Sequence, residues 1–268
     1  MKDRIKRLVS VLLCTVMLTA LASCNAEENG EDEPVFEPVR IPTWFFDKDK
    51  EKETEKPIFS KASEVSVMID AGHGFDDPGL TSPLTDATEA QITSKVADLV
   101  TADLAGRGYN VLVTHDGKTF PTTRHSNGDR VYDDGERIDF ANSLSADIML
   151  SLHCGIAYGD GAESVRGVRL SYCDDPEEKH DEPADLCESL RDALHKKYPD
   201  YKTPVINADP PEEAYHITRY SDKCTVLCIM GCLSNKDDAQ NLTDPEWQKD
   251  FAEALCDGID AYFIDKYE

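Results

Sequence analysis

The sequence has few basic residues and no apolar run long enough for a comfortable membrane span. Lys and Arg total 28 against 53 Asp and Glu, which gives a formal net charge of −25 at pH 7. Because phosphate contacts need a basic surface, this balance argues against nucleic acid as a partner. The same excess of negative charge disfavours tight attraction to other anionic polymers. No internal repeat is visible along the chain.

The N-terminus has the features of an export signal. Several Lys and Arg residues precede the apolar stretch 8–20, which is too short to span a bilayer comfortably. It ends in Leu21-Ala22-Ser23-Cys24, small residues before a cysteine, as in bacterial lipoproteins. We therefore expect residues 1–23 to be a lipoprotein signal peptide and Cys24 to be acylated. The protein would then be exported and anchored by lipid to the outer face of a bacterial membrane. The alternative is an ordinary secretory signal in which Cys24 is incidental.

Residues 24–61 are rich in Glu, Asp, Lys and Pro. Such a segment buries too little apolar surface to offset the entropy of ordering, so we interpret it as a disordered tether. The remainder, residues 62–268, is long enough for one globular domain with a sizeable core.

Cysteine is plentiful but has no obvious pairing. Seven cysteines follow Cys24, and an odd number in an exported protein leaves at least one thiol unpaired or paired elsewhere. Cys224, Cys228 and Cys232 are evenly spaced, which is compatible with a metal cluster. The segment 225–230 has the composition of a buried strand, and we favour that interpretation.

Apolar strand-like runs alternate with helical patterns along the domain. Thr88 and Gln91 form a capping box at the start of one helix, and Asp244-Pro245 is a favoured start for the last. Strands are expected at 65–69, 110–114, 148–152, 167–172 and 225–230, and helices around 88–104, 138–144, 183–194 and 245–262. This alternation predicts an α/β fold: a single three-layer domain with a twisted, mostly parallel central sheet and helices on both faces.

Two histidines stand where predicted strands end. His73 follows strand 65–69 and His153 follows strand 148–152, and functional groups collect beyond the carboxyl ends of strands in open α/β sheets. Glu89 opens the helix between them, although a carboxylate there is also favoured by the helix dipole alone. Two imidazoles and a carboxylate suit a catalytic zinc ion, which keeps an open position for water. We expect Asp70 to accept a hydrogen bond from His73 and orient it.

Several short motifs that occur together in one known protein family are spread over about residues 65–264. They are Ile69-Asp-Ala-Gly-His-Gly with Asp77-Pro-Gly79, Glu89 at the start of a helix that runs to Gly108, Glu136-Arg137 to Asn142, Ala146-Asp147 to His153, Arg219, and Gly231-Cys-Leu-Ser-Asn235. In this order they resemble the zinc-dependent N-acetylmuramoyl-L-alanine amidases, which cut peptidoglycan. The resemblance implies that His73, Glu89 and His153 bind Zn²⁺, and that Asp70, Arg219 and Asn235 support the metal or the substrate. It also implies that peptidoglycan or muropeptides are the substrate, and we expect a monomer.

One position departs from the family pattern. Where the family carries a catalytic glutamate in the final strand, this chain has Ile229, which cannot transfer a proton. Losing a general base costs a factor of about 10²–10⁴ in rate. Three hypotheses stay open: an amidase that uses slow metal chemistry or takes its base from Glu212 or Glu213; a catalytically impaired, zinc-binding lipoprotein that recognises wall peptides or regulates an amidase; and a structural zinc domain with no wall ligand.

Overall fold

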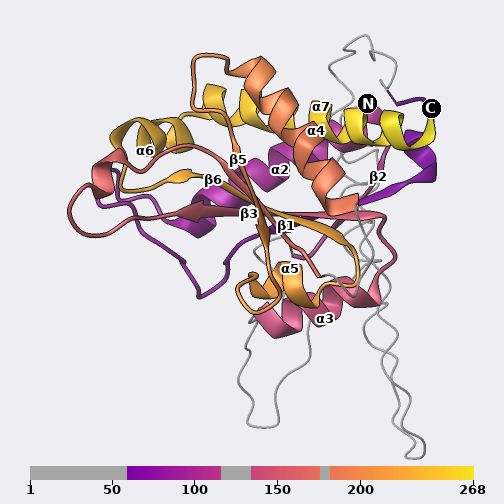
Figure 1. Cartoon of the computed structure of the whole chain (residues 1–268), viewed down its shortest axis with the longest axis horizontal. Helices are drawn as coiled ribbons and strands as arrows, with labels where there is room; N and C mark the ends of the chain where they lie inside the picture. Colours follow the sequence, from indigo (N-terminus) through magenta and orange to yellow (C-terminus); the bar gives the residue numbers. More distant parts are fainter. Residues whose placement is uncertain (1–58, 116–133, 176–181) are drawn as a thin grey trace, which may run out of the picture. The chain divides into compact units, whose positions relative to one another are not determined.

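A six-stranded sheet forms the centre of the computed structural model, which describes residues 59–115, 134–175 and 182–268 (Figure 1). The strand order is β2-β1-β3-β6-β4-β5, and every neighbouring pair is parallel except β4 and β6. The mostly parallel sheet predicted from the sequence is therefore confirmed. The strands are β1 (Ser66–Ala71), β2 (Asn110–Val113), β3 (Ile148–Gly155), β4 (Arg169–Cys173), β5 (Val205–Asp209) and β6 (Cys224–Cys232).

Helices cover both faces of this sheet, which makes the three predicted layers. The long helices α2, α4 and α7 pack together on one face, and the shorter α3 and α5 lie on the other (Figure 1). The helices are α2 (Glu89–Arg107), α3 (Asp134–Ser143), α4 (Glu182–Lys197), α5 (His216–Tyr220), α6 (Lys236–Thr243) and α7 (Pro245–Tyr267), with 3-10 turns η2 (Ala62–Glu64) and η3 (Ala162–Ser164).

The helix boundaries follow the capping residues that the sequence predicted. Thr88 accepts a hydrogen bond from the Gln91 backbone N–H, and the Gln91 side chain accepts one from the Thr88 N–H. Asp244 caps α7 with its carboxylate, which accepts hydrogen bonds from the backbone N–H groups of Glu246 and Trp247, and Pro245 stands in the first turn. The capping box matters for function because it fixes Glu89 as the first residue of α2.

The folded domain begins earlier than predicted. Phe59 lies in the segment expected to be a tether, yet its side chain is fully buried and stacks on Phe263 of α7 at 5.6 Å between ring centroids. Phe59 therefore belongs to the folded domain, which was predicted to begin at residue 62. The predicted signal peptide, Cys24 and the rest of the tether lie outside the described residues.

The sequence analysis missed β5, α5 and α6. Strand β5 is an edge strand whose residues are only partly buried, so it shows no clear apolar alternation. Helices α5 and α6 are too short for a 3.6-residue period to be recognised.

The cysteines of β6 belong to the core. The whole of β6 is buried, and none of the seven cysteines in the described residues forms a disulfide. Residues four apart in a strand lie about 13 Å apart, so Cys224, Cys228 and Cys232 are too far apart to share one metal ion. The interpretation of this segment as a strand is confirmed. Within the described ranges, no helix is both long and apolar enough to cross a bilayer.

Candidate metal site

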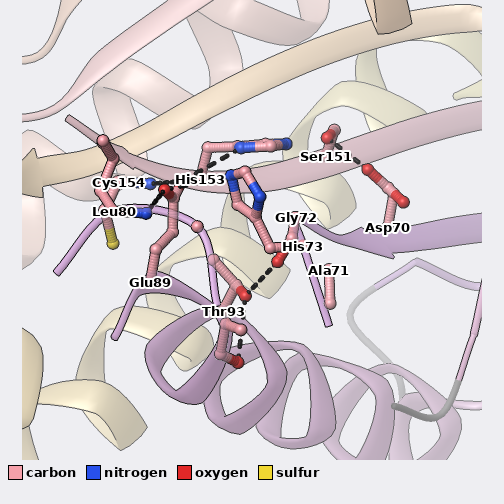
Figure 2. A network of polar contacts seen from close by, with 12 residues as sticks. Asp70, Ala71, Gly72, His73, Leu80, Glu89, Thr93, Ser151, His153 and Cys154 are labelled. Carbon is pink, nitrogen blue, oxygen red and sulfur yellow. Dashed lines mark hydrogen bonds and ion pairs between the residues drawn. The ribbon is translucent and has the colours of Figure 1, made fainter. Parts of the chain in front are cut away.

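Three side chains far apart in the sequence meet at the carboxyl edge of the sheet. His73 follows β1, Glu89 begins α2 and His153 belongs to β3, and one nitrogen or oxygen atom from each lies within 4.8 Å of the other two. Figure 2 shows both imidazole rings turned toward the Glu89 carboxylate. The structure therefore brings together the three residues that the sequence analysis selected as metal ligands.

Glu89 is the buried centre of this cluster. Its side chain is only 1% exposed, and its two oxygens lie 3.1 Å from His73 Nε2 and 3.1 Å from His153 Nδ1. Backbone N–H groups of Leu80 and Cys154 also donate to these oxygens, at 3.0 and 2.8 Å. Burial opposes ionisation, but the hydrogen bonds from His153, His73 and the two backbone groups hold the pKa of Glu89 well below its usual range. The carboxylate is thus a fixed negative charge that favours a cation beside it.

His73 has an uncommon backbone conformation, and its ring lies between the carboxylates of Asp77 and Glu89. Its φ of 64° lies in the left-handed region, which strains a residue other than glycine by about 1–3 kcal/mol. Its Nδ1 lies 2.6 Å from Asp77 Oδ2. An ionised carboxylate only accepts, so Nδ1 carries the proton when the ring is neutral, and Nε2 is left to face Glu89. When the ring is protonated on both nitrogens, Nε2 donates to Glu89, and this hydrogen bond raises the pKa of His73 to about 9 despite its partial burial.

Two glycines provide the space in which the imidazoles lie. A Cβ atom on Gly72 would lie 2.4 Å from His153 Cε1, and one on Gly79 would lie 2.6 Å from the His73 ring and 2.9 Å from Glu89 Oε2. No side chain larger than hydrogen fits at either position without displacing a candidate ligand. Two nitrogens, a buried carboxylate and this cleared space together fit a zinc ion.

Replacing Gly72 with Ala should therefore weaken zinc binding at least about tenfold, because ligand distances tolerate shifts of only about 0.2 Å. Gly72 has an ordinary backbone φ, so the new methyl group acts on His153 rather than on the chain. Gly106→Ala is the matched control, since a Cβ there meets nothing within 4 Å. It should leave zinc binding unchanged and stabilise α2 by about 0.5–1 kcal/mol. Isothermal titration with zinc and thermal unfolding measure the two effects; equal zinc affinity in both variants would refute the steric role of Gly72.

Asp77 is expected to increase the metal affinity of the site by orienting the His73 ring. Asp77→Ala removes the acceptor of Nδ1–H, and loss of such a partner typically costs about 10–100-fold in metal affinity. The neighbouring Asp76, which is exposed, is the control: Asp76→Ala should bind zinc as the unchanged chain does. Competition with a chromophoric chelator measures both, and identical affinities for the two variants would contradict this role of Asp77.

Asp70 does not have the role expected for it. Its fully buried carboxylate accepts hydrogen bonds from Ser151 Oγ at 2.5 Å and Thr114 Oγ1 at 2.6 Å, whereas His73 is oriented by Asp77. Burial opposes ionisation of Asp70, but the Arg137 guanidinium, His153 and the two hydroxyl donors keep its pKa below the usual range. The expectation failed because the left-handed turn at His73 directs its ring toward the following loop instead of back to the strand.

Arg219 and Asn235 are not in the cluster. Asn235 is the N-cap of α6: its Oδ1 accepts from the backbone N–H groups of Asp237 and Asp238, and its Nδ2 donates to the Glu163 carbonyl. Arg219 is exposed on α5, where its guanidinium lies 5.2 Å from the centroid of the Tyr220 ring. The structure thus gives Asn235 a role in loop and helix geometry.

Ile229, which occupies the position of the family glutamate, lies beside His153. The two residues are register partners on β3 and β6, and both line a cavity of about 640 Å³. Its neighbours Cys228 and Met230 belong to the core cluster on the opposite face. Neither Glu212 nor Glu213 lines this cavity, so the structure supports neither as a replacement base. The cavity also contains Arg169 and Lys202, which the sequence analysis did not select.

The fold and the cluster together define an α/β domain with a candidate metal centre at the carboxyl edge of its sheet. Residues 67–261 match the family model described as N-acetylmuramoyl-L-alanine amidase. The chain therefore belongs to this family of hydrolases, and the resemblance seen in the sequence is confirmed.

Individual relatives are distant. The chain is 26% identical over 200 residues to the uncharacterized protein YqiI of Bacillus subtilis, with 74% of this chain and 84% of YqiI covered. It is 24% identical over 200 residues to the probable cell wall amidase LytH of Staphylococcus epidermidis, again covering 74% of this chain but only 58% of LytH. The solved structure of the N-acetylmuramoyl-L-alanine amidase AmiC2 of Nostoc punctiforme superposes with a TM-score of 0.62 at 22% identity, covering 76% of this chain and 99% of that one. The last likeness confirms the fold.

Proposed function

We propose that this protein is a zinc-dependent peptidoglycan hydrolase that cleaves the amide between N-acetylmuramic acid and the L-alanine of the stem peptide. The observation that carries the proposal is the convergence of His73, Glu89 and His153 in a chain that belongs to the amidase family. These three residues would hold the ion. Bound there, zinc supplies Lewis-acid activation of the amide carbonyl and of the attacking water.

The chain's own residues prepare this chemistry. Asp77 fixes the His73 tautomer, and the backbone donors on Glu89 hold its carboxylate in one orientation. The cavity next to His153 is lined by apolar side chains such as Ile156, by Gly155 and Gly231, and by several basic side chains. A substrate amide in this cavity would lie beside the metal cluster.

Ile229 favours a second candidate function. Position 229 is adjacent to His153, yet isoleucine neither accepts nor donates a proton, and it is 9% exposed. A chain with the ligands and without the base fits a catalytically impaired homologue that binds wall peptides or regulates an amidase. The two functions share the metal site and differ in turnover.

An assay of turnover on muropeptides distinguishes the hydrolase from the catalytically impaired homologue. The purified, zinc-loaded protein is incubated with muropeptides, and release of peptide beginning with L-Ala is followed by mass spectrometry. The hydrolase predicts slow release that is abolished in His153→Ala. Muropeptide binding without release, with zinc demonstrably present, would establish the impaired homologue instead. If stripping zinc unfolds the protein while muropeptides leave its stability unchanged, the site is a structural one.

We further propose that the protein is exported, monomeric and lipid-anchored through Cys24 to the outer face of a bacterial membrane. The support is the lipoprotein-like sequence that ends in Leu21-Ala22-Ser23-Cys24. Cys24→Ser should release the protein from the membrane fraction of expressing cells, whereas Cys14→Ser, within the predicted signal, should leave it there. Retention of the Cys24→Ser protein in that fraction would contradict the anchor, and light scattering tests the monomer.

A further inference from the structure

The cavity beside the metal cluster is cationic in a strongly acidic chain. It is lined by Arg137, Arg166, Arg169 and Lys202, and none of the described residues that line it is Asp or Glu. The protein as a whole carries 53 acidic residues against 28 basic ones. Basic side chains are therefore concentrated at the one place where a ligand would lie next to the metal.

Two of these cations have no partner of opposite charge in the part of the chain that the structure describes. Arg166 is paired with Asp237 at 2.8 Å, and the buried Arg137 lies 3.7 Å from the carboxylate of Asp70. Arg169 and Lys202, in contrast, are exposed and make no ion pair or side-chain hydrogen bond within the described ranges.

Asp238, whose carboxylate accepts a hydrogen bond from Gly167 of the cavity lining, already has partners. Asp238 accepts hydrogen bonds from the backbone N–H groups of Gly167 and Cys232 and from the Tyr201 hydroxyl. It is 1% exposed, so it is not available to the cavity. Arg169 and Lys202 therefore present their charge to whatever enters.

The sheet register places Arg169 in line with the metal cluster. His153 on β3 is opposite Ile229 on β6, and Ile229 is opposite Arg169 on β4. Residues directly opposite on neighbouring strands project from the same face, and neighbouring strands are about 4.8 Å apart. His153 and Arg169 are thus about 10 Å apart across the sheet, and all three residues line the same cavity.

We propose that Arg169 and Lys202 form a carboxylate-binding subsite that holds the stem peptide by an acidic group beyond the scissile amide. This rests on the proposed function, because the His153 end of the cavity must receive the amide. An extended peptide advances about 3.3 Å per residue, so the separation corresponds to about three residues. The subsite selects substrates by a carboxylate on the third residue, and Arg169 is a substrate-binding residue that takes no part in proton transfer.

Gly167 keeps Lys202 in place for this role. A Cβ on Gly167 would lie 3.1 Å from Lys202 Cδ and 3.3 Å from its Cβ, and the Gly167 φ of +97° excludes other residues without strain. The aliphatic stem of Lys202 thus lies across Gly167, and Lys202 lines the cavity together with Arg169 of β4.

The test uses N-acetyl-L-alanyl-glycyl-glycine and its C-terminal amide, which differ only in the carboxylate. Binding to the zinc-loaded protein is measured by NMR titration. The free acid should bind about tenfold more tightly than the amide, and this ratio should fall to near one in Arg169→Gln and decrease in Lys202→Gln. Any attraction between zinc and the peptide carboxylate is the same in all variants. A change in the acid-to-amide binding ratio therefore measures the contribution of the substituted cation. Arg169→Lys should retain part of the preference, and the exposed Lys249→Gln on α7 should retain all of it.

A length series supplies the second readout. With zero to four glycines after alanine, the preference for acid over amide should peak at two or three glycines. An acid-to-amide ratio unchanged by Arg169→Gln, a ratio independent of length, or no binding of either peptide would each overturn the subsite. Zinc content and muropeptide turnover are measured on the same preparations. Loss of turnover with the preference intact counts against the hydrolase alone, and turnover without the preference counts against the subsite alone.

Discussion

Ile229→Glu is expected to raise amidase turnover by about 10²–10⁴-fold, the usual contribution of a general base. Ile229 lies beside His153 in the sheet register and faces the same cavity, so an introduced carboxylate would reach a water at the metal cluster. The unchanged chain has the candidate ligands, and isoleucine at position 229 cannot accept a proton. Steady-state release of L-Ala-headed peptide from muropeptides measures the gain.

The control for this experiment is Ile229→Gln, which has the shape of glutamate without its basicity. It should give no gain, and thermal unfolding with zinc bound shows whether both variants fold equally well. Because Arg169 lies directly opposite position 229, its guanidinium would attract the introduced carboxylate and lower its basicity. The gain should therefore be larger in an Arg169→Gln background when it is measured at saturating substrate. Equal turnover of the Glu and Gln variants would show that position 229 does not carry the missing base.

His153→Ala is expected to lower zinc affinity by more than about 100-fold. Loss of a supporting partner of a ligand costs up to about 100-fold, and His153 is itself one of the three candidate ligands among the described residues. The loss also leaves Glu89 buried with one fewer hydrogen-bond donor, so the metal-free variant should be less stable than the metal-free parent. Competition with a chelator of known zinc affinity measures the first effect, and denaturant unfolding measures the second.

The matched control is His195→Ala, an exposed histidine near the end of α4. Its zinc affinity should equal that of the unchanged chain. If the two alanine variants bind zinc alike, the metal lies elsewhere and the cluster is not the site.

Much of the site could be predicted because its residues stand at element boundaries. His73 and His153 follow runs that are plainly strands, and the Thr88 capping box fixes Glu89 at the start of a helix. In a parallel sheet these boundaries meet at one edge, so local patterns were enough to bring the three side chains together.

The remaining features depend on geometry that local patterns do not encode. Choosing Asp77 over Asp70 as the partner of His73 required the left-handed φ of a residue that is not glycine. To predict that Arg169 lies near His153, one must know that β4 lies between β6 and β5 and that it pairs with β6 in an antiparallel register. Since β5 has no apolar alternation and was missed, the alignment of Arg169 with His153 could not be derived from the sequence.

X-ray absorption at the zinc edge of natively purified protein tests the central claim most directly. The account predicts one zinc ion per chain with a coordination shell of imidazole nitrogen and carboxylate or water oxygen at about 2.0–2.2 Å. It also predicts that this signal disappears in His153→Ala. A shell containing sulfur at about 2.3 Å, which would come from the cysteines, or protein purified without zinc that does not bind added zinc, would contradict it.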